Sequence, residues 1–390
     1  MNILFVYFHT ILPKRGGTER VAYTVAHALK RCGHSVHFMA THATEQDFND
    51  SFASDYIFIR NEESQEKRKQ IIIDTCKELH IDVLINIAGE AGHQDIFSNK
   101  VLPNVKIISW FHFDVYGFIK YFLRSNTISR LKRWVSNMLD RIGINAHYLR
   151  WSSFYRKRYL EVIDVSDAVV GVTPVIAEQL KQFTGSHSDK ITSILNPTSF
   201  PDIHPTYDTQ AKEKLLIYVG HLSLPKHVEK IIGAWAKLAH KYPDWKLEIA
   251  GDGEKKESLM HMVRTRNIPR VSFLGRITDV NALYNRAEHL ILASDSFESF
   301  GCVVIESLTY GCYPIVIDYP SAKVVIPSPQ IGTRIHKRSS RELAKAIDYA
   351  LSTNASNRNN MEAVTQHLES FNMDKLVLEW QDLLNQITSR

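Results

Sequence analysis

Two glutamates, Glu298 and Glu306, lie in the stretch ILASDSFESFGCVVIESLTYGCYPIV at residues 291–316. Its pattern predicts a buried strand, a turn, a helix and a second strand. Glu298 falls in the turn, and Glu306 lies about two helical turns into the helix, which ends at Gly311. The two carboxylates are therefore not an acid and a base that face each other on one helix.

The start of the predicted helix offers backbone N–H groups and the positive end of a helix dipole, which suit a phosphate. Carboxylates aimed at that phosphate would repel it. Because ionised carboxylates only accept hydrogen bonds, sugar hydroxyls are their natural partners. A phosphate together with two polyols describes a nucleotide sugar. The spacing equally allows a turn residue and an exposed helix residue that bind nothing.

The chain has 390 residues, which is too long for one ordinary core and predicts two domains of similar size. A hydrophobic content of 44% with 23% charged residues is typical of a soluble globular protein. The four cysteines form no C-x-x-C pair and the N-terminus lacks a basic leader, so a reducing cytoplasm is expected. No apolar run reaches about 18 residues, so no transmembrane helix is expected.

The N-terminal half alternates predicted strands and helices. The strand NILFVYF is followed by the loop PKRGGTE, a helix that ends at Gly33 and the strand SVHFMAT. Gly17 in this loop allows a ligand to approach the backbone, or a tight turn that serves packing alone. The loop is not G-x-G-x-x-G, which argues against a dinucleotide site.

His112 directly follows the predicted strand VKIISWF at 105–111. Ligands in open α/β sheets bind at the carboxyl ends of the strands, so His112 is a candidate for substrate contact. A structural histidine is the alternative.

A basic and aromatic segment runs from residue 120 to residue 158. It holds ten lysines and arginines and one acidic residue, Asp140. This composition favours an anionic partner, either membrane headgroups or an anionic lipid-linked acceptor. A solvated helical face is the alternative, and nucleic acid is disfavoured because no nucleic-acid motif accompanies the charge.

The proline-containing stretch 196–214 lacks periodicity and marks the predicted domain boundary. The second half restarts with a strand at 215–219, a turn and a helix. Lys226 lies in that turn, where it is either the fixed cation of a diphosphate site or a solvating lysine. No D-x-D triplet occurs in the chain, so the usual carboxylate pair for Mg²⁺ or Mn²⁺ on a sugar diphosphate is missing.

Several short motifs extend over nearly the whole chain: GGTERV, NP at 196–197, VGHLSLPK, AGDGEKK, VSFLGR, DVNALY and ESFGCVVIESLTYGCYPIV with its E-x7-E spacing. Together they resemble family 4 of the retaining glycosyltransferases. The resemblance implies an α/β GT-B fold with two Rossmann-like domains that face each other across a cleft. Residues 1–200 would bind the acceptor and residues 201–370 the nucleotide sugar. The helix at 371–390 would cross back to the first domain.

The resemblance also implies roles for individual residues. Glu298 would hold hydroxyls of the donor hexose, and Glu306 would hold the ribose. Lys226 matches the lysine that binds the diphosphate, and His112 matches the histidine beside the reacting face of the sugar. The expected catalytic residues are Glu298, His112 and Lys226. The expected donor-binding residues are Gly17, His221, Lys226, Gly251, Arg276, Glu298, Ser299, Phe300, Gly301, Cys302, Val303 and Glu306.

One position departs from the family pattern. The family usually has arginine after the glycine of the VG turn, whereas this chain has His221. The charge of histidine depends on pH, and imidazole cannot reproduce the bidentate contacts of a guanidinium group. Weaker donor binding, compensation by a residue such as Arg276, and a degraded site are the three open consequences.

The implied reaction is transfer of a hexose-type sugar with retention from a nucleotide-diphosphate sugar, with UDP-sugar as the favoured donor. The expected acceptor is a hydroxyl of a lipid-linked or cell-surface polysaccharide, as in lipopolysaccharide synthesis. Lys226, His221 and the helix start would neutralise the leaving diphosphate, so neither a metal nor another cofactor is expected.

The expected location is the cytoplasm, with peripheral binding at the inner face of the cell membrane. A catalytically silent binding or scaffold protein and a nucleotide-sugar epimerase on the same fold are the alternatives. The sequence gives no oligomeric state and no partner beyond donor, acceptor and membrane surface.

Overall fold

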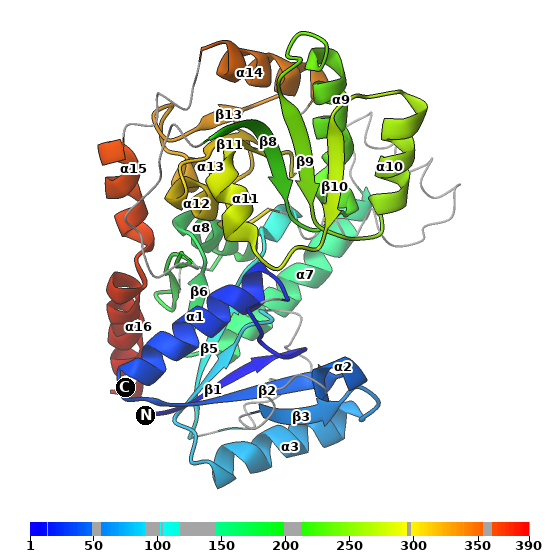
Figure 1. Cartoon of the computed structure of the whole chain (residues 1–390). Coiled ribbons are helices and arrows are strands. Elements are labelled where there is room, and N and C mark those ends of the chain that lie inside the picture. Colours follow the sequence, from blue (N-terminus) through cyan, green and yellow to red (C-terminus); the bar gives the residue numbers. More distant parts are fainter. Residues whose placement is uncertain are drawn as a thin grey trace. The chain divides into compact units, whose positions relative to one another are not determined.

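The computed structural model divides the chain into two compact units. The first unit comprises Met1–Pro197 with Met373–Arg390, and the second comprises Thr198–Asn372. Each unit is built on one parallel sheet that is covered by helices (Figure 1). The residues described are 1–13, 15–48, 56–89, 102, 104–117, 146–186, 188–198, 212–294, 298–337, 339–353 and 361–389, with the backbone alone at 46, 48 and 146–151.

The first sheet has seven parallel strands in the order β3-β2-β1-β4-β5-β6-β7. β4 and β6 are buried along their whole length, which explains their nearly continuous apolar sequences VLIN and AVVG. The strand order reverses between β1 and β4, as in a Rossmann unit. The strands are β1 (Asn2–Tyr7), β2 (Ser35–Ala43), β3 (Tyr56–Arg60), β4 (Val83–Asn86), β5 (Lys106–Phe111), β6 (Ala168–Gly171) and β7 (Ile191–Ser193).

Helix α8 of the first unit (Pro174–Thr184) begins and ends at residues with clear capping roles. At the start of α8, the hydroxyl of Thr173 accepts a hydrogen bond from Ile176 N at 3.3 Å, and Pro174 occupies the first turn. Gly185 ends the same helix in the left-handed conformation. The helices are α1 (Gly17–Arg31), α2 (Glu45–Phe48), α3 (Gln65–Glu78), α7 (Ala146–Val165), α8 (Pro174–Thr184) and α16 (Met373–Thr388).

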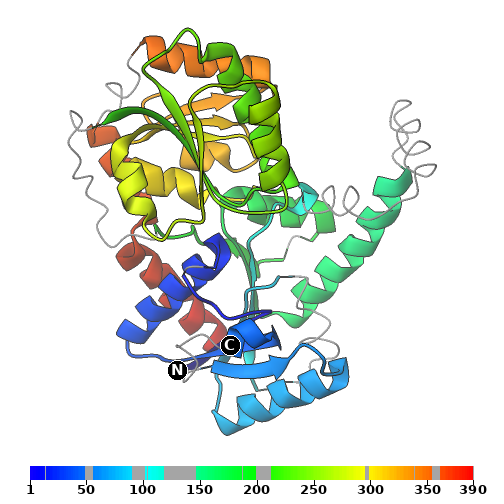
Figure 2. The same ribbon diagram turned by 45° about the vertical axis from the view of Figure 1, so that its right-hand side comes forward.

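The sequence predicts an amphipathic helix at 371–387, which is found as the C-terminal helix α16 (Met373–Thr388). This helix belongs to the first unit. It lies beside α1 in both views (Figures 1 and 2). Trp380 of α16 is fully buried, and its ring meets Trp110 of β5 edge to face at a centroid distance of 4.7 Å. Because buried aromatic rings dominate core energetics, α16 is part of the hydrophobic core of this unit.

The second sheet has six parallel strands in the order β10-β9-β8-β11-β12-β13, which again reverses beside the first strand. The reversal lies between β8 and β11. The loops that follow these two strands are therefore where a ligand site is expected. The strands are β8 (Glu213–Val219), β9 (Lys246–Ala250), β10 (Val271–Gly275), β11 (Ala287–Leu292), β12 (Tyr313–Ile317) and β13 (Thr333–Ile335).

The helices of the second unit pack on its sheet and on one another. α9 (Val228–Leu238) and α14 (Ser340–Ser352) lie side by side in both views (Figures 1 and 2). Six residues on the apolar face of α9, among them Trp235, are buried in the core. The helical elements are η3 (Leu224–Lys226), α9 (Val228–Leu238), α10 (Lys256–Thr265), α11 (Val280–Arg286), α12 (Cys302–Thr309), α13 (Ala322–Val325), α14 (Ser340–Ser352), α15 (Met361–Leu368) and η5 (Glu369–Phe371).

The predicted basic segment 120–158 is described only in part. Residues 120–145 lie outside the described residues, and residues 146–158 form most of α7 (Ala146–Val165). Across the helices that the structure describes, none combines the length and the apolar character that a membrane span requires. Contact of this segment with an anionic membrane surface stays a prediction.

Candidate functional site

The turn before α12 is the centre of the predicted site. Gly301 adopts the left-handed conformation, with φ +81°, and caps the helix that begins at Cys302. A Cβ atom at this glycine would collide with the hydroxyl of Tyr319. Since the N–H groups of a first helical turn have no acceptor within the helix, this turn is where an anion would bind. Phe300 and Gly301 are buried, whereas Ser299, Cys302 and Val303 are half-buried.

Gly301→Ala is expected to lower the free energy of unfolding by more than the ~1–2 kcal/mol that a left-handed L-residue costs. The reason for the excess is the collision with the Tyr319 hydroxyl. Gly33→Ala is the matched control, because Gly33 has φ +88° but no atom within 4 Å of an added Cβ. Urea denaturation of both variants measures the difference. If both variants lost the same free energy of unfolding, the Tyr319 side chain would have moved aside without an energetic penalty.

Lys226 and Glu298 form an ion pair at this turn, with Lys226 Nζ 2.6 Å from Glu298 Oε2. Lys226 ends the short helix η3 after β8, and Glu298 follows β11, which is the neighbour of β8 in the sheet. The exposed fractions of the two side chains are 25% and 12%. Lys226 is therefore not an exposed solvating lysine. The structure places both predicted catalytic residues of this unit in direct contact.

Two buried tyrosines lie beside Glu298. Burial, and after it the negative charge of Glu298, raise the pKa of Tyr218 and the pKa of Tyr319. Both hydroxyls therefore remain protonated and can donate. Tyr218 Oη donates to the carbonyl oxygen of His221 at 2.9 Å. Tyr319 Oη donates to the carbonyl oxygen of Phe300 at 2.8 Å, which holds the turn before Gly301 in place.

Glu306 lies in the second turn of α12 and is 2% exposed. Its Oε2 accepts a hydrogen bond from Tyr284 Oη of α11 at 3.0 Å. The alternative that Glu306 is an exposed helix residue is therefore wrong. A buried carboxylate with a fixed donor is a side chain that the fold holds in one orientation.

His221 and Gly251 lie in loops that are bonded together at the carboxyl edge of the second sheet. Gly220 N donates to Ala250 O at 3.0 Å, and Gly251 N donates to Gly275 O at 2.7 Å. Gly251 has φ +146°, and a Cβ there would collide with the carbonyl oxygen of Gly220. Glycine at this position therefore allows a close approach of two backbones.

The side chain of His221 lies on the surface, 60% exposed, with Nε2 3.4 Å from Glu254 Oε2. An exposed pair of this kind contributes little stability, so His221 can exchange Glu254 for another partner. Arg276 is also exposed and follows β10 directly. The hydrogen bond from Lys256, and to a smaller extent the charge of Arg276, lower the pKa of Asp252. Two basic side chains, Lys256 and Arg276, are thus close to the loop that holds Gly251.

His112 and Gly17 belong to the first unit. His112 follows β5, is buried, and packs on Trp110 at a ring centroid distance of 4.4 Å. Burial lowers the pKa of His112 to about 3, so the imidazole is neutral at physiological pH. A neutral imidazole offers a hydrogen bond but no positive charge. Gly17 is exposed and is the first residue of α1.

Two family models match adjacent parts of the chain. The model described as Glycosyltransferase Family 4 matches residues 15–199, and the model described as Glycosyl transferases group 1 matches residues 199–367. The chain belongs to glycosyltransferase family 4. The resemblance that its sequence motifs carry is thereby confirmed.

This glycosyltransferase has full-length and partial relatives. An uncharacterized glycosyltransferase of Haemophilus influenzae is 26% identical, over 97% of this chain and 99% of its own. The GalNAc-alpha-(1->4)-GalNAc-alpha-(1->3)-diNAcBac-PP-undecaprenol alpha-1,4-N-acetyl-D-galactosaminyltransferase of Campylobacter jejuni is 28% identical, over 51% of this chain and 55% of its own. Anabaena HepE in complex with UDP has a similar fold, with a TM-score of 0.70 and 14% identity over 99% of this chain and 100% of its own. The predicted α/β GT-B fold is confirmed.

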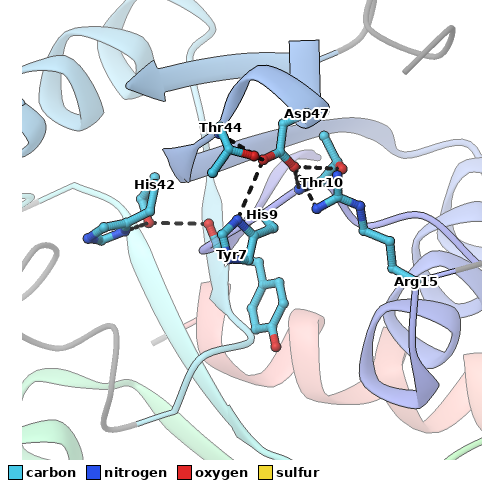
Figure 3. Close-up of polar contacts among 8 residues, drawn as sticks. Tyr7, His9, Thr10, Arg15, His42, Thr44 and Asp47 are labelled. Carbon is cyan, nitrogen blue, oxygen red and sulfur yellow. Dashed lines mark hydrogen bonds and ion pairs between the residues drawn. The ribbon is translucent and has the colours of Figure 1, made fainter. Parts of the chain in front are cut away.

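Sequence reasoning missed Asp47, whose carboxylate accepts hydrogen bonds from several residues of the first unit (Figure 3). Its side chain is fully buried. Oδ1 accepts from Thr10 N at 2.9 Å, from Thr10 Oγ1 at 2.9 Å and from Arg15 Nη1 at 2.8 Å. Oδ2 accepts from the N–H and the hydroxyl of Thr44, each at 2.8 Å, and lies 3.5 Å from His9 Nδ1.

Asp47 fixes the loop between β1 and α1, which leads to Gly17. Thr10 and Arg15, which donate to Oδ1, belong to this loop. Thr44, which donates to Oδ2, directly precedes α2, the helix that contains Asp47 (Figure 3). The T-x-x-D spacing of Thr44 and Asp47 is a helix N-terminus signature that predicts the hydrogen bond from the Thr44 N–H to the Asp47 carboxylate. The bonds to Thr10 and Arg15 are tertiary contacts, which local spacing does not reveal.

The described part of this glycosyltransferase contains no group of three or more His, Cys, Asp or Glu side chains that could hold a metal ion. The metal-independent mechanism stays a prediction. The individual donor-binding roles of the site residues likewise stay predictions.

Proposed function

We propose that this glycosyltransferase moves a hexose-type sugar, with retention, from a UDP-sugar to a hydroxyl of a lipid-linked or cell-surface polysaccharide acceptor. The observation that carries the proposal is the Lys226–Glu298 pair at the start of α12, with Nζ and Oε2 2.6 Å apart. A cation and a carboxylate thus lie together at a helix N-terminus. The cation and the helix N-terminus suit the diphosphate of a nucleotide sugar, and the carboxylate suits the hydroxyls of its hexose.

In this mechanism Lys226 and the first turn of α12 bind the diphosphate. Glu298 accepts hydrogen bonds from hydroxyls of the hexose, and Glu306 accepts them from the ribose. His221 can turn from Glu254 to the phosphate, which adds charge when its ring is protonated. As the bond to the diphosphate breaks, positive charge develops on the sugar and the acceptor hydroxyl attacks on the same face.

His112 completes the proposed catalytic set. Its ring is neutral, because burial lowers its pKa to about 3. A neutral imidazole can accept or donate a hydrogen bond at the reacting sugar without repelling the oxocarbenium-like centre. In this proposal Lys226 stabilises the leaving group.

One relative and one structural neighbour support the acceptor and donor classes. The Campylobacter jejuni relative acts, by its name, on a glycan linked through diphosphate to undecaprenol. The structural neighbour HepE binds UDP. These names favour a UDP-sugar and a lipid-linked acceptor over the other donors and acceptors of the family.

Calorimetry with UDP-, GDP- and ADP-sugars is the test, followed by NMR of the products. We expect micromolar binding of a UDP-sugar, slow hydrolysis without acceptor, and α-configured products from α-configured donors. Binding of no donor would indicate a silent scaffold protein. Interconversion of the donor sugar without acceptor would indicate an epimerase. Inverted products would overturn the retaining mechanism.

A further inference from the structure

Tyr284 contacts a predicted ligand-binding side chain although no sequence motif assigns it a role. Its hydroxyl donates to Glu306 Oε2 at 3.0 Å, and both side chains are buried, Tyr284 completely. Tyr284 lies on α11 and Glu306 on α12, so the contact joins two helices of the second unit. The hydrogen bond occupies one carboxylate oxygen, and a carboxylate can accept about four hydrogen bonds in all.

The backbone and the ring of Tyr284 are fixed independently of its hydroxyl. Lys212 Nζ donates to the carbonyl oxygen of Tyr284 at 2.9 Å, and Cys312 Sγ donates to the same oxygen at 3.0 Å. The ring stacks on Tyr310 at a centroid distance of 6.0 Å and an interplanar angle of 18°. The Tyr284 hydroxyl is therefore held in one place, and its hydrogen bond fixes the orientation of the Glu306 carboxylate.

We propose that Tyr284 is a positioning residue, which holds Glu306 so that the carboxylate selects nucleotides that carry ribose hydroxyls. The inference rests on the proposed function, in which Glu306 binds the ribose. A fixed buried carboxylate discriminates against a ligand that lacks its hydroxyl partners, because that ligand does not supply the donors for which the carboxylate is oriented. A carboxylate that can rotate recovers other partners and discriminates less.

The test compares the affinity of UDP, GDP and ADP with that of their 2′,3′-dideoxy counterparts by calorimetry. For the best-bound base, the wild-type protein should prefer the ribonucleotide by about tenfold or more. Tyr284→Phe should reduce that preference at least about fivefold, and Glu306→Gln should reduce it at least as far. Tyr284→Phe should have no further effect in the Glu306→Gln background, because both changes remove the same interaction.

Tyr242→Phe is the matched control. Tyr242 Oη also donates to a carboxylate of the same unit, Asp348 Oδ1, at 2.7 Å. This variant loses a tyrosine–carboxylate bond outside the site, so it should keep the wild-type preference for ribose. The preference is a ratio of two affinities on one sample, and partial unfolding of a variant therefore does not change it.

Each other outcome overturns a stated claim. If the wild-type protein binds none of the three nucleotides, the proposed function falls and the inference falls with it. An unchanged preference in Glu306→Gln would refute the ribose role of Glu306. Glu306→Gln could lose the preference for ribonucleotides while Tyr284→Phe keeps it, as the control Tyr242→Phe does. That result would refute the positioning role of Tyr284 and leave the proposed function standing.

Discussion

Lys226→Met and Glu298→Gln each lower the rate of sugar transfer by about tenfold or more, which corresponds to about 1.4 kcal/mol of barrier. Lys226→Met removes the cation that stabilises the leaving diphosphate. Glu298→Gln removes the negative charge that orients the hexose hydroxyls and pairs with Lys226. Steady-state kinetics with the donor identified by the panel measure both effects.

The two variants should differ in their affinity for the bare nucleoside diphosphate. Lys226→Met weakens it, because the phosphate loses a charged partner. Glu298→Gln leaves it unchanged or strengthens it, because Lys226 no longer divides its hydrogen bonds between Glu298 and the phosphate. Calorimetry with UDP separates these directions.

Lys214 and Asp244 provide a matched control for the pair. Their side chains form an exposed ion pair in the same unit, with Lys214 Nζ 2.9 Å from Asp244 Oδ2. Lys214→Met and Asp244→Asn should transfer sugar at the wild-type rate. Wild-type turnover in both Lys226→Met and Glu298→Gln would refute the proposed site.

Asp47→Ala lowers the free energy of unfolding of the first unit by about 3–5 kcal/mol, the usual cost of removing one partner of a buried ion pair. The change leaves the Arg15 guanidinium and the donors of Thr10 and Thr44 without their acceptor. Urea denaturation followed by circular dichroism measures the loss. Glu45→Ala, an exposed position of the same helix, should stay within about 0.5 kcal/mol of the wild type.

The stabilisation by Asp47 depends on pH with a defined sign. Burial favours the neutral carboxyl, but the N–H groups of Thr10 and Thr44 and then their hydroxyls outweigh burial and lower the pKa of Asp47. A lowered pKa in the folded state means that the stabilisation is complete above the unfolded pKa of about 3.9 and is lost as the pH falls through the folded pKa.

The stability difference between the wild type and Asp47→Asn should therefore be constant near neutral pH and shrink below about pH 4. A difference that shrinks on the alkaline side instead would refute the ionised state of Asp47. An Asp47→Ala protein as stable as Glu45→Ala would refute the role of Asp47 in holding the loop after β1.

The sequence by itself determined the alternation of strands and helices and the local form of the site. Buried parallel strands are short apolar runs between helical patterns, so the predicted strand at 105–111 is found as Lys106–Phe111. The turn and the helix that follows it, found as α12 (Cys302–Thr309), also followed from local rules, because the motif combines a turn with a helical period. The spacing of Glu298 and Glu306 thus gave their elements correctly.

Only the tertiary structure decided which side chains meet. Lys226 and Glu298 are 72 residues apart, and Tyr284 and Glu306 are 22 apart. Their contacts depend on β8 and β11 being neighbours in the sheet and on α11 packing near α12, whereas periodicity reports only on residues close in the chain. Burial of His112 and Asp47 arises in the same way, because packing rather than local sequence sets how much solvent reaches a side chain.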